Sequence, residues 1–71
     1  MNMFRRRVSL KWNDKEGVGY LSLPDRPAKK DRAGCVKRSL RLYDLDPTLK
    51  GIDIYIDIDD KNRIIGIELL E

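Results

Sequence analysis

The chain has 71 residues, of which 38% are charged, and its formal net charge is +3. A chain of this length forms a single domain, residues 1–71, and its one cysteine and lack of histidine exclude an internal disulfide, a Ser-His or Cys-His nucleophile pair and a His/Cys metal cage. No stretch is apolar enough to span a membrane and the first residues lack the apolar segment of a secretory signal, so we expect a cytoplasmic protein.

The first predicted element is a β-hairpin. Residues 8–12 alternate apolar and polar side chains, which is the period of a strand with one buried face. The sequence Asn-Asp-Lys-Glu-Gly at residues 13–17 is typical of a turn, and residues 18–23 are typical of the returning strand.

The middle of the chain is predicted to form an exposed loop, a strand and a turn. Residues 24–34 hold two prolines, a final glycine and six charged side chains, which favours a surface loop without regular structure. Apolar side chains at even positions of residues 36–44 predict a third strand. Asp46 and Pro47 then begin a turn, with the option of one helical turn in which Asp46 is the N-cap and Pro47 the first helical residue.

A second hairpin closes the chain. Isoleucine occupies every second position of residues 52–58, so these side chains share one face of a strand, and residues 63–70 are its partner. The turn between them is residues 59–62, in which Asn62 stands where a left-handed residue is needed. Gly66, inside the last strand, predicts a bulge or the close approach of a neighbouring ring or backbone.

Together these elements predict a mainly β fold, a small antiparallel meander of about five strands with little or no helix. One sheet leaves its apolar face open to water, so we expect it to curl into a partial barrel or to stack on a second copy as a dimeric sandwich. The predicted buried face consists of Val8, Leu10, Trp12, Val18, Tyr20, Val36, Leu40, Leu42, Ile52, Ile54, Ile56, Ile58, Ile65, Ile67 and Leu69. The apolar side chains expected on the opposite side are Leu21, Leu23, Tyr43, Ile64 and Leu70.

Both ends of the chain resemble domain-of-unknown-function family 2283. Its members open with a strand that ends in an aromatic residue and a short acidic turn, which is similar to Val-Ser-Leu-Lys-Trp-Asn-Asp at residues 8–14, followed by Gly-Tyr-Leu-Ser-Leu at residues 19–23. They close with an Asp-rich turn and a Gly-Ile-Glu-Leu-Leu ending, similar to residues 56–70. The resemblance implies a small β-rich domain with no assigned activity. Because some members look like partners in two-gene toxin-antitoxin arrangements, it also implies an antitoxin-like role as one option.

Four acidic side chains near the closing turn are the candidate metal ligands: Asp57, Asp59, Asp60 and Glu68. Three of them fall at positions 1, 3 and 12 of a calcium loop, but Asn62 occupies position 6, where glycine is needed, and the flanking segments are strands. We therefore expect no metal, no cofactor and no enzymatic activity. Asp53, Asp57 and Glu68 are instead expected to pair with basic side chains on neighbouring strands.

Basic residues are concentrated in one half of the chain. Residues 1–41 hold 12 Lys/Arg against 4 Asp/Glu, and residues 42–71 hold 3 against 8. This asymmetry indicates either two halves that pair in the fold or a face that binds polyanions. Strand alternation places Lys11 and Arg41 on the face opposite Trp12, although acidic side chains share that face. The candidate nucleic-acid-binding residues are Arg5, Arg6, Arg7, Lys29, Lys30, Arg32, Lys37, Arg38 and Arg41.

These patterns predict a non-enzymatic protein that acts through protein-protein interaction, either as a homodimer or by binding a protein partner. The apolar surplus on both sides of a thin sheet favours this function. The alternative is a nucleic-acid-binding protein that uses its basic half.

Overall fold

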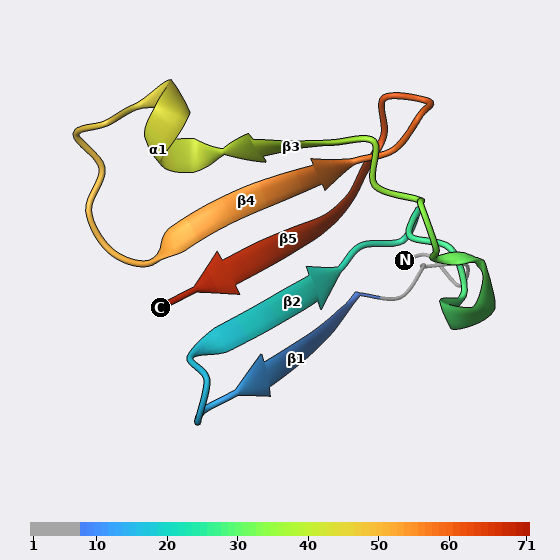
Figure 1. Ribbon diagram of the computed structural model, residues 1–71, viewed down its shortest axis with the longest axis horizontal. Coiled ribbons are helices and arrows are strands. Elements are labelled where there is room, and N and C mark those ends of the chain that lie inside the picture. Colours follow the sequence, from blue (N-terminus) through green and yellow to red (C-terminus); the bar gives the residue numbers. More distant parts are fainter. Residues whose placement is uncertain (1–7) are drawn as a thin grey trace, which may run out of the picture.

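The computed structural model describes residues 8–71, which form one sheet of five antiparallel strands with two short helical segments. The strands are β1 (Ser9–Asn13), β2 (Val18–Ser22), β3 (Arg38–Arg41), β4 (Asp53–Ile58) and β5 (Ile64–Leu70) (Figure 1). The helical segments are a 3-10 turn, η1 (Lys29–Asp31), and a single α-helical turn, α1 (Leu42–Leu45). The predicted mainly β fold with little helix is confirmed.

The strands lie in the order β1-β2-β5-β4-β3, so a simple meander is interrupted once. Both predicted hairpins are present, but β2 pairs with β5 instead of with β3. Residues 23–37, which contain η1, cross the end of the sheet and begin β3 at its far edge (Figure 1). At about 3.3 Å per residue this segment is long enough to pass two strands, so the last strand can pair with the first hairpin.

The turn between β4 and β5 has the predicted form. Asn62 adopts a φ of 65°, in the left-handed region. Asp59 Oδ1 accepts hydrogen bonds from the amides of Lys61 and Arg63 at 2.9 and 2.8 Å, and Asp59 Oδ2 accepts one from Arg63 Nε at 2.8 Å. These bonds, led by the one from the Arg63 amide, lower the pKa of Asp59, so the carboxylate form caps this turn.

The helical turn lies before Asp46, not after it. Residue 46 ends α1, because its amide donates to the Leu42 carbonyl and its own backbone is extended, with φ −147° and ψ 95°. The ring of Pro47 disfavours a helical conformation at the preceding residue, so a helix that starts upstream must stop there. Asp46 Oδ1 instead accepts hydrogen bonds from the amide and hydroxyl of Thr48, at 3.1 and 2.6 Å.

The strand register assigns each side chain to one of two faces, because residues directly opposite each other in antiparallel strands share a face. Leu21 lies opposite Leu10 on β1 and Ile67 on β5, so it belongs to the apolar side, and Val18 and Tyr20 belong to the other. The predicted orientation of β2 is therefore wrong. Apolar side chains occupy both alternating sets of β2. Which set lies on the apolar side of the sheet therefore depends on the pairing of β2 with β1 and β5.

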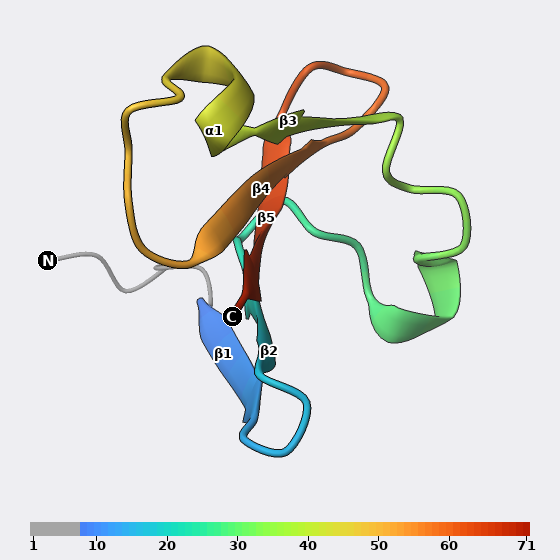
Figure 2. The same cartoon turned by 60° about the vertical axis from the view of Figure 1, so that its left-hand side comes forward.

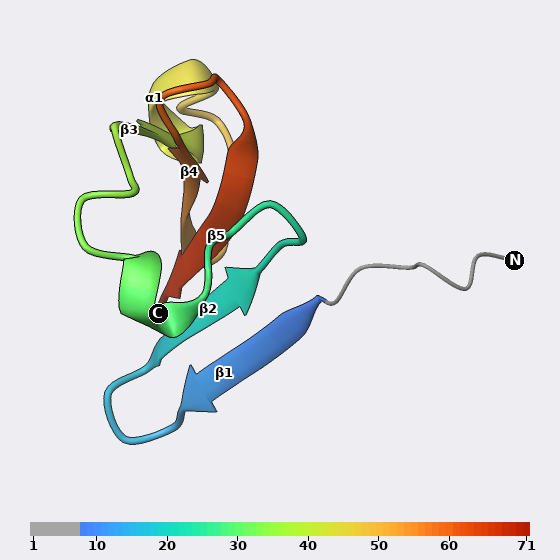
Figure 3. The ribbon, with the colours of Figure 1, turned by 90° about the vertical axis from the view of Figure 1, so that its right-hand side faces the viewer.

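The sheet is a single, twisted, open layer with β1 and β3 at its edges (Figure 2, Figure 3). Within residues 8–71, Ile58 and Ile65 are the fully buried apolar side chains, with exposed fractions of 4% and 0%. Their carbonyls accept hydrogen bonds from Lys37 and Leu23 at the end of the sheet that residues 23–37 cross. Apart from α1, which contacts β3 and β4, no helix or further strand of the described chain packs on this sheet.

Candidate interaction surface

One face of the sheet carries an apolar side chain on every strand, with Arg38 at the end of β3 as a charged neighbour. A row of five aliphatic side chains runs from edge to edge: Leu10, Leu21, Ile67, Ile56 and Leu40. A second row consists of Trp12, Gly19, Leu69 and Ile54. None of these residues is fully buried, and Leu10 is 59% exposed. We call the two rows the apolar face.

Trp12 lies at the edge of the apolar face, as predicted. Its ring packs over Gly19 on β2, where any Cβ would overlap the ring. The indole Nε1 donates to Asp14 Oδ1 at 2.5 Å, and 41% of the residue remains exposed. A large aromatic side chain that is held in place but only partly covered is typical of an interface anchor.

The opposite face carries hydrogen-bonding and charged side chains. One row consists of Lys11, Tyr20, Glu68, Tyr55 and Arg41, and the next consists of Ser9, Ser22, Gly66, Asp57 and Ser39. We call these two rows the polar face. A groove of about 380 Å³ lies over β1, β2 and β5 on this face, and Glu68 is among the residues that line it.

Asp57 is the buried centre of the polar face, with an exposed fraction of 1%. The Tyr20 hydroxyl donates to Oδ2 at 2.9 Å, the Ser39 hydroxyl donates to Oδ1 at 2.7 Å, and Glu68 is also hydrogen-bonded to this carboxylate. The bond to Asp57, together with burial, raises the pKa of Glu68 to about 7. The prediction that Asp57 and Glu68 pair with basic side chains is wrong, because the basic side chains of this face lie at its two edges.

Gly66 allows Tyr20 to reach across β5 to Asp57 on β4. A Cβ on Gly66 would overlap the Tyr20 hydroxyl, which confirms the predicted close approach of a neighbouring ring. The strand is also bulged here, since Asp57 pairs with Gly66 and Ile58 with residue 64. Burial raises the pKa of Tyr20, and the hydrogen bond to Asp57 raises it further. The Tyr20 hydroxyl is therefore a neutral donor.

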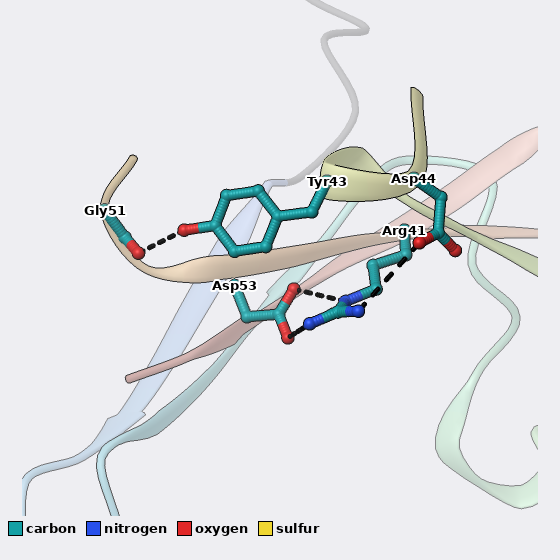
Figure 4. A network of polar contacts seen from close by, with 5 residues as sticks. All are labelled: Arg41, Tyr43, Asp44, Gly51 and Asp53. Atoms are coloured by element: carbon teal, nitrogen blue, oxygen red, sulfur yellow. Dashed lines mark hydrogen bonds and ion pairs between the residues drawn. The ribbon is translucent and has the colours of Figure 1, made fainter. Parts of the chain in front are cut away.

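Arg41, at the β3 edge, is held by Asp53 (Figure 4). Its Nε donates to Oδ1 at 3.0 Å and its Nη2 to Oδ2 at 2.9 Å, while Asp44 lies 3.9 Å from Nη1. The hydrogen bonds to Asp53 are the main reason that the pKa of Arg41 lies above its usual value. The Tyr43 hydroxyl, nearby, donates to the Gly51 carbonyl. The predicted pairing of Asp53 with a basic side chain is confirmed, so the charge of Arg41 is already matched within the fold.

The predicted nucleic-acid-binding residues are not gathered on one face of the described chain. They form two groups, Lys29, Lys30 and Arg32 in or beside η1, and Lys37, Arg38 and Arg41 in or beside β3. Arg38 and Arg41 point to opposite faces of the sheet, and Arg38 Nη2 donates to Asn62 Oδ1 at 2.5 Å. Arg32 Nε donates to the Pro27 carbonyl at 3.0 Å. Arg5, Arg6 and Arg7 lie outside the described residues.

The four acidic candidates are divided between two places. Asp59 caps the β4–β5 turn beside the exposed Asp60, whereas Asp57 and Glu68 belong to the polar face. Within residues 8–71, no three Cys, Asp or Glu side chains are placed to hold a metal ion. No helix in the same range is long and apolar enough to cross a membrane.

Sequence reasoning missed the cluster of Tyr20, Ser39 and Glu68 around Asp57. Two signals in the sequence point to it. Gly66 is a glycine inside a strand whose other residues are aliphatic apart from Glu68, and Asp57 alternates with isoleucines in residues 52–58. A carboxylate in an interior strand needs several donors, and a glycine opposite it leaves room for one of them.

No family model, curated protein or solved structure matches this chain. The resemblance to family 2283 therefore stays a prediction that rests on the motifs at the two ends of the chain.

Proposed function

We propose that this chain is a non-enzymatic protein-protein interaction module and that a second copy of the chain covers its apolar face. The observation that carries the proposal is the aliphatic row that crosses all five strands without any member being fully buried. A sheet with one apolar face is stable in water only when another layer covers that face.

The small core is the reason to propose that another chain supplies the covering layer. A domain below about 70–80 residues seldom gains more than about 3–5 kcal/mol from a whole core. Here the apolar face contributes little of that, because the buried aliphatic side chains of the described chain, Ile58 and Ile65, lie at one end of the sheet. Covering the face is thus a requirement for folding. A second copy of the chain can supply this cover without any other protein.

The aliphatic row of the apolar face can also pack against the same row of a second copy. Its order, Leu-Leu-Ile-Ile-Leu, is aliphatic at both ends and contains no charge, so a two-fold axis near Ile67 places aliphatic against aliphatic along its length. Two sheets packed in this way lie about 10 Å apart and bury no unpaired charge from either row. Trp12 would lie at the rim of this interface, where its exposed ring area meets the other copy.

Sedimentation equilibrium with a matched pair of variants tests the proposal. Leu10 and Leu45 are similarly exposed in the single chain, at 59% and 64%, but only Leu10 lies on the apolar face. We expect the wild-type chain and Leu45→Glu to have the mass of a dimer. Leu10→Glu should weaken dimerisation at least tenfold, because it buries a charge at the interface.

A wild-type chain that is folded and monomeric over the whole accessible concentration range would overturn the proposal. So would dimers that dissociate equally with either leucine variant. Co-purification of a different protein on the apolar face, displaced by Leu10→Glu, would replace the second copy with that partner, as the antitoxin-like role requires. Nucleic-acid binding remains the alternative prediction, and no arrangement of the described basic residues favours it over this one.

A further inference from the structure

The cluster around the buried Asp57 on the polar face draws side chains from the β1–β2 hairpin and from each of the other three strands. Tyr20 comes from the β1–β2 hairpin, Asp57 from β4, Ser39 from β3 and Glu68 from β5 itself. The hairpin pairs with the rest of the sheet through one seam, between β2 and β5. In the described chain, no side-chain hydrogen bond other than Tyr20 to Asp57 links residues 8–22 to β3, β4 or β5.

We propose that Tyr20, Asp57 and Glu68 form a proton-operated latch that holds the β1–β2 hairpin against the rest of the sheet. With a proton on Glu68 the latch is closed, and loss of that proton loosens the β2–β5 seam. The inference is independent of how the apolar face is covered, because the latch lies on the opposite face.

The contact of Glu68 with Asp57 favours a proton on Glu68. Asp57 is only 1% exposed and already accepts hydrogen bonds from two hydroxyls, so water cannot solvate it as a second anion approaches. Glu68 contacts it by donating a hydrogen bond, and it can donate only when it is protonated. Two carboxylates in contact repel each other, and the exposed one is the one that moves away.

No basic side chain near Glu68 in the described chain is placed to offset the repulsion between Glu68 and Asp57. Lys11 lies on the far side of Tyr20 at the β1 edge, and Arg41 is bound by Asp53 at the β3 edge. Arg26 lies over the Tyr20 ring, with its guanidinium carbon 4.1 Å from the ring centre. The titratable and charged groups that share the groove, the paired strands or a hydrogen bond with Glu68 are Lys11, Glu16, Tyr20, Tyr55 and Asp57, with Arg26 beyond Tyr20 and Arg41 beyond Tyr55.

Solvent reaches the latch through the groove on the polar face. Glu68 lines this groove, so its proton exchanges with water without unfolding. The pKa of Glu68 is raised from its usual value to about 7 in the folded chain. A raised folded-state pKa means that the latch stabilises the fold below the usual pKa of a glutamate, and that this contribution is lost as the pH rises through about 7.

Native-state hydrogen exchange at pH 6 and pH 8, corrected for the intrinsic exchange rates, tests the latch. We expect the protection of β1 and β2 amides to fall by up to about tenfold between the two values, the limit for one group with this shift, while β4 amides change less than threefold. Glu68→Gln keeps a donor for Asp57 without titrating, so its hairpin should stay protected at both values. Glu16→Gln removes a carboxyl from the same groove but not from the latch, and it should keep the wild-type pH dependence.

A wild-type hairpin whose protection is equal at both pH values overturns the latch. A fall in protection that persists unchanged in Glu68→Gln does so as well. Sedimentation at the same two pH values, at the concentration used for exchange, separates these outcomes from dissociation of a dimer. Tyr20→Phe provides a second check: it removes the hydroxyl but keeps the ring, and its hairpin should already be less protected at pH 6.

Discussion

At the scale of single residues, the contact between Tyr20 and Gly66 positions the polar face. The tyrosine ring lies over a strand position that has no side chain, and its hydroxyl thereby reaches Asp57 two strands away. Asp57 in turn is nearly fully buried, and two hydroxyl donors take the place of water around its side chain. One glycine therefore determines whether the buried carboxylate can be satisfied.

Gly66→Ala is expected to destabilise the protein by about 1–3 kcal/mol, the usual cost of forcing an extra carbon into a packed site. The new Cβ would overlap the Tyr20 hydroxyl. In a Tyr20→Ala background the same change should stabilise by about 0.5–1 kcal/mol, because alanine is favoured over glycine within a strand. Urea unfolding of the four chains measures both values. Equal effects of Gly66→Ala in the two backgrounds would show that the ring contact is not the reason for the glycine.

At the scale of elements, the β4–β5 hairpin is the part of the fold that local sequence specifies most completely. Isoleucine alternation defines β4, Asp59 caps the turn with its carboxylate, and Asn62 supplies the left-handed residue. Its neighbour β2 has no comparable local signal for which face is buried. Hairpin register depends on turn chemistry, whereas the face of β2 depends on two long-range pairings.

Substitution of Asn62 separates backbone conformation from side-chain contact. Asn62→Ala should cost about 1 kcal/mol, because alanine lacks the short polar side chain with which asparagine tolerates a φ of 65°. Asn62→Gly should be about 1 kcal/mol more stable than Asn62→Ala, because glycine adopts this φ without steric cost. Both variants lose the hydrogen bond from Arg38. Thermal unfolding of the two variants provides the comparison. A glycine variant no more stable than the alanine variant would mean that the lost hydrogen bond, and not the backbone, controls this position.

At the scale of the whole molecule, the two faces of the sheet have different requirements. The polar face satisfies its own buried groups through Asp57 and the Arg41–Asp53 pair. On the apolar face, in contrast, both rows are exposed or half-buried within the described chain. A dimer formed through that face therefore couples folding to association.

Coupled folding and association predicts that stability depends on protein concentration. A tenfold rise in the concentration of the wild-type chain should raise its Tm by about 3–5 °C. Leu10→Glu should reduce both the Tm and its dependence on concentration, whereas Leu45→Glu should retain the dependence. Scanning calorimetry at three concentrations measures this. A Tm that is constant for the wild-type chain would indicate that the single sheet is stable as a monomer.

Much of the fold could be predicted from alternation and turn residues, but the candidate sites could be predicted only in part. Trp12 was expected on the apolar side and Gly66 beside a neighbouring ring, and both are found there. Tyr20 was expected in the core, because a tyrosine between glycine and leucine has no local feature that distinguishes a buried ring from a hydrogen-bond donor. Its partner Asp57 lies 37 positions away, beyond the range of any local pattern.

The sequence by itself determined the number of strands, their approximate limits, the two hairpins and the left-handed Asn62, because each follows from side-chain periodicity or from the conformational preference of one residue. The tertiary structure alone decided that β5 lies between β2 and β4, and hence which side chains share a face. The physical reason is that strand pairing joins residues that are distant in the chain. Alternation identifies two sets of side chains on each strand, but only the pairing decides which set becomes apolar surface and which surrounds a buried carboxylate.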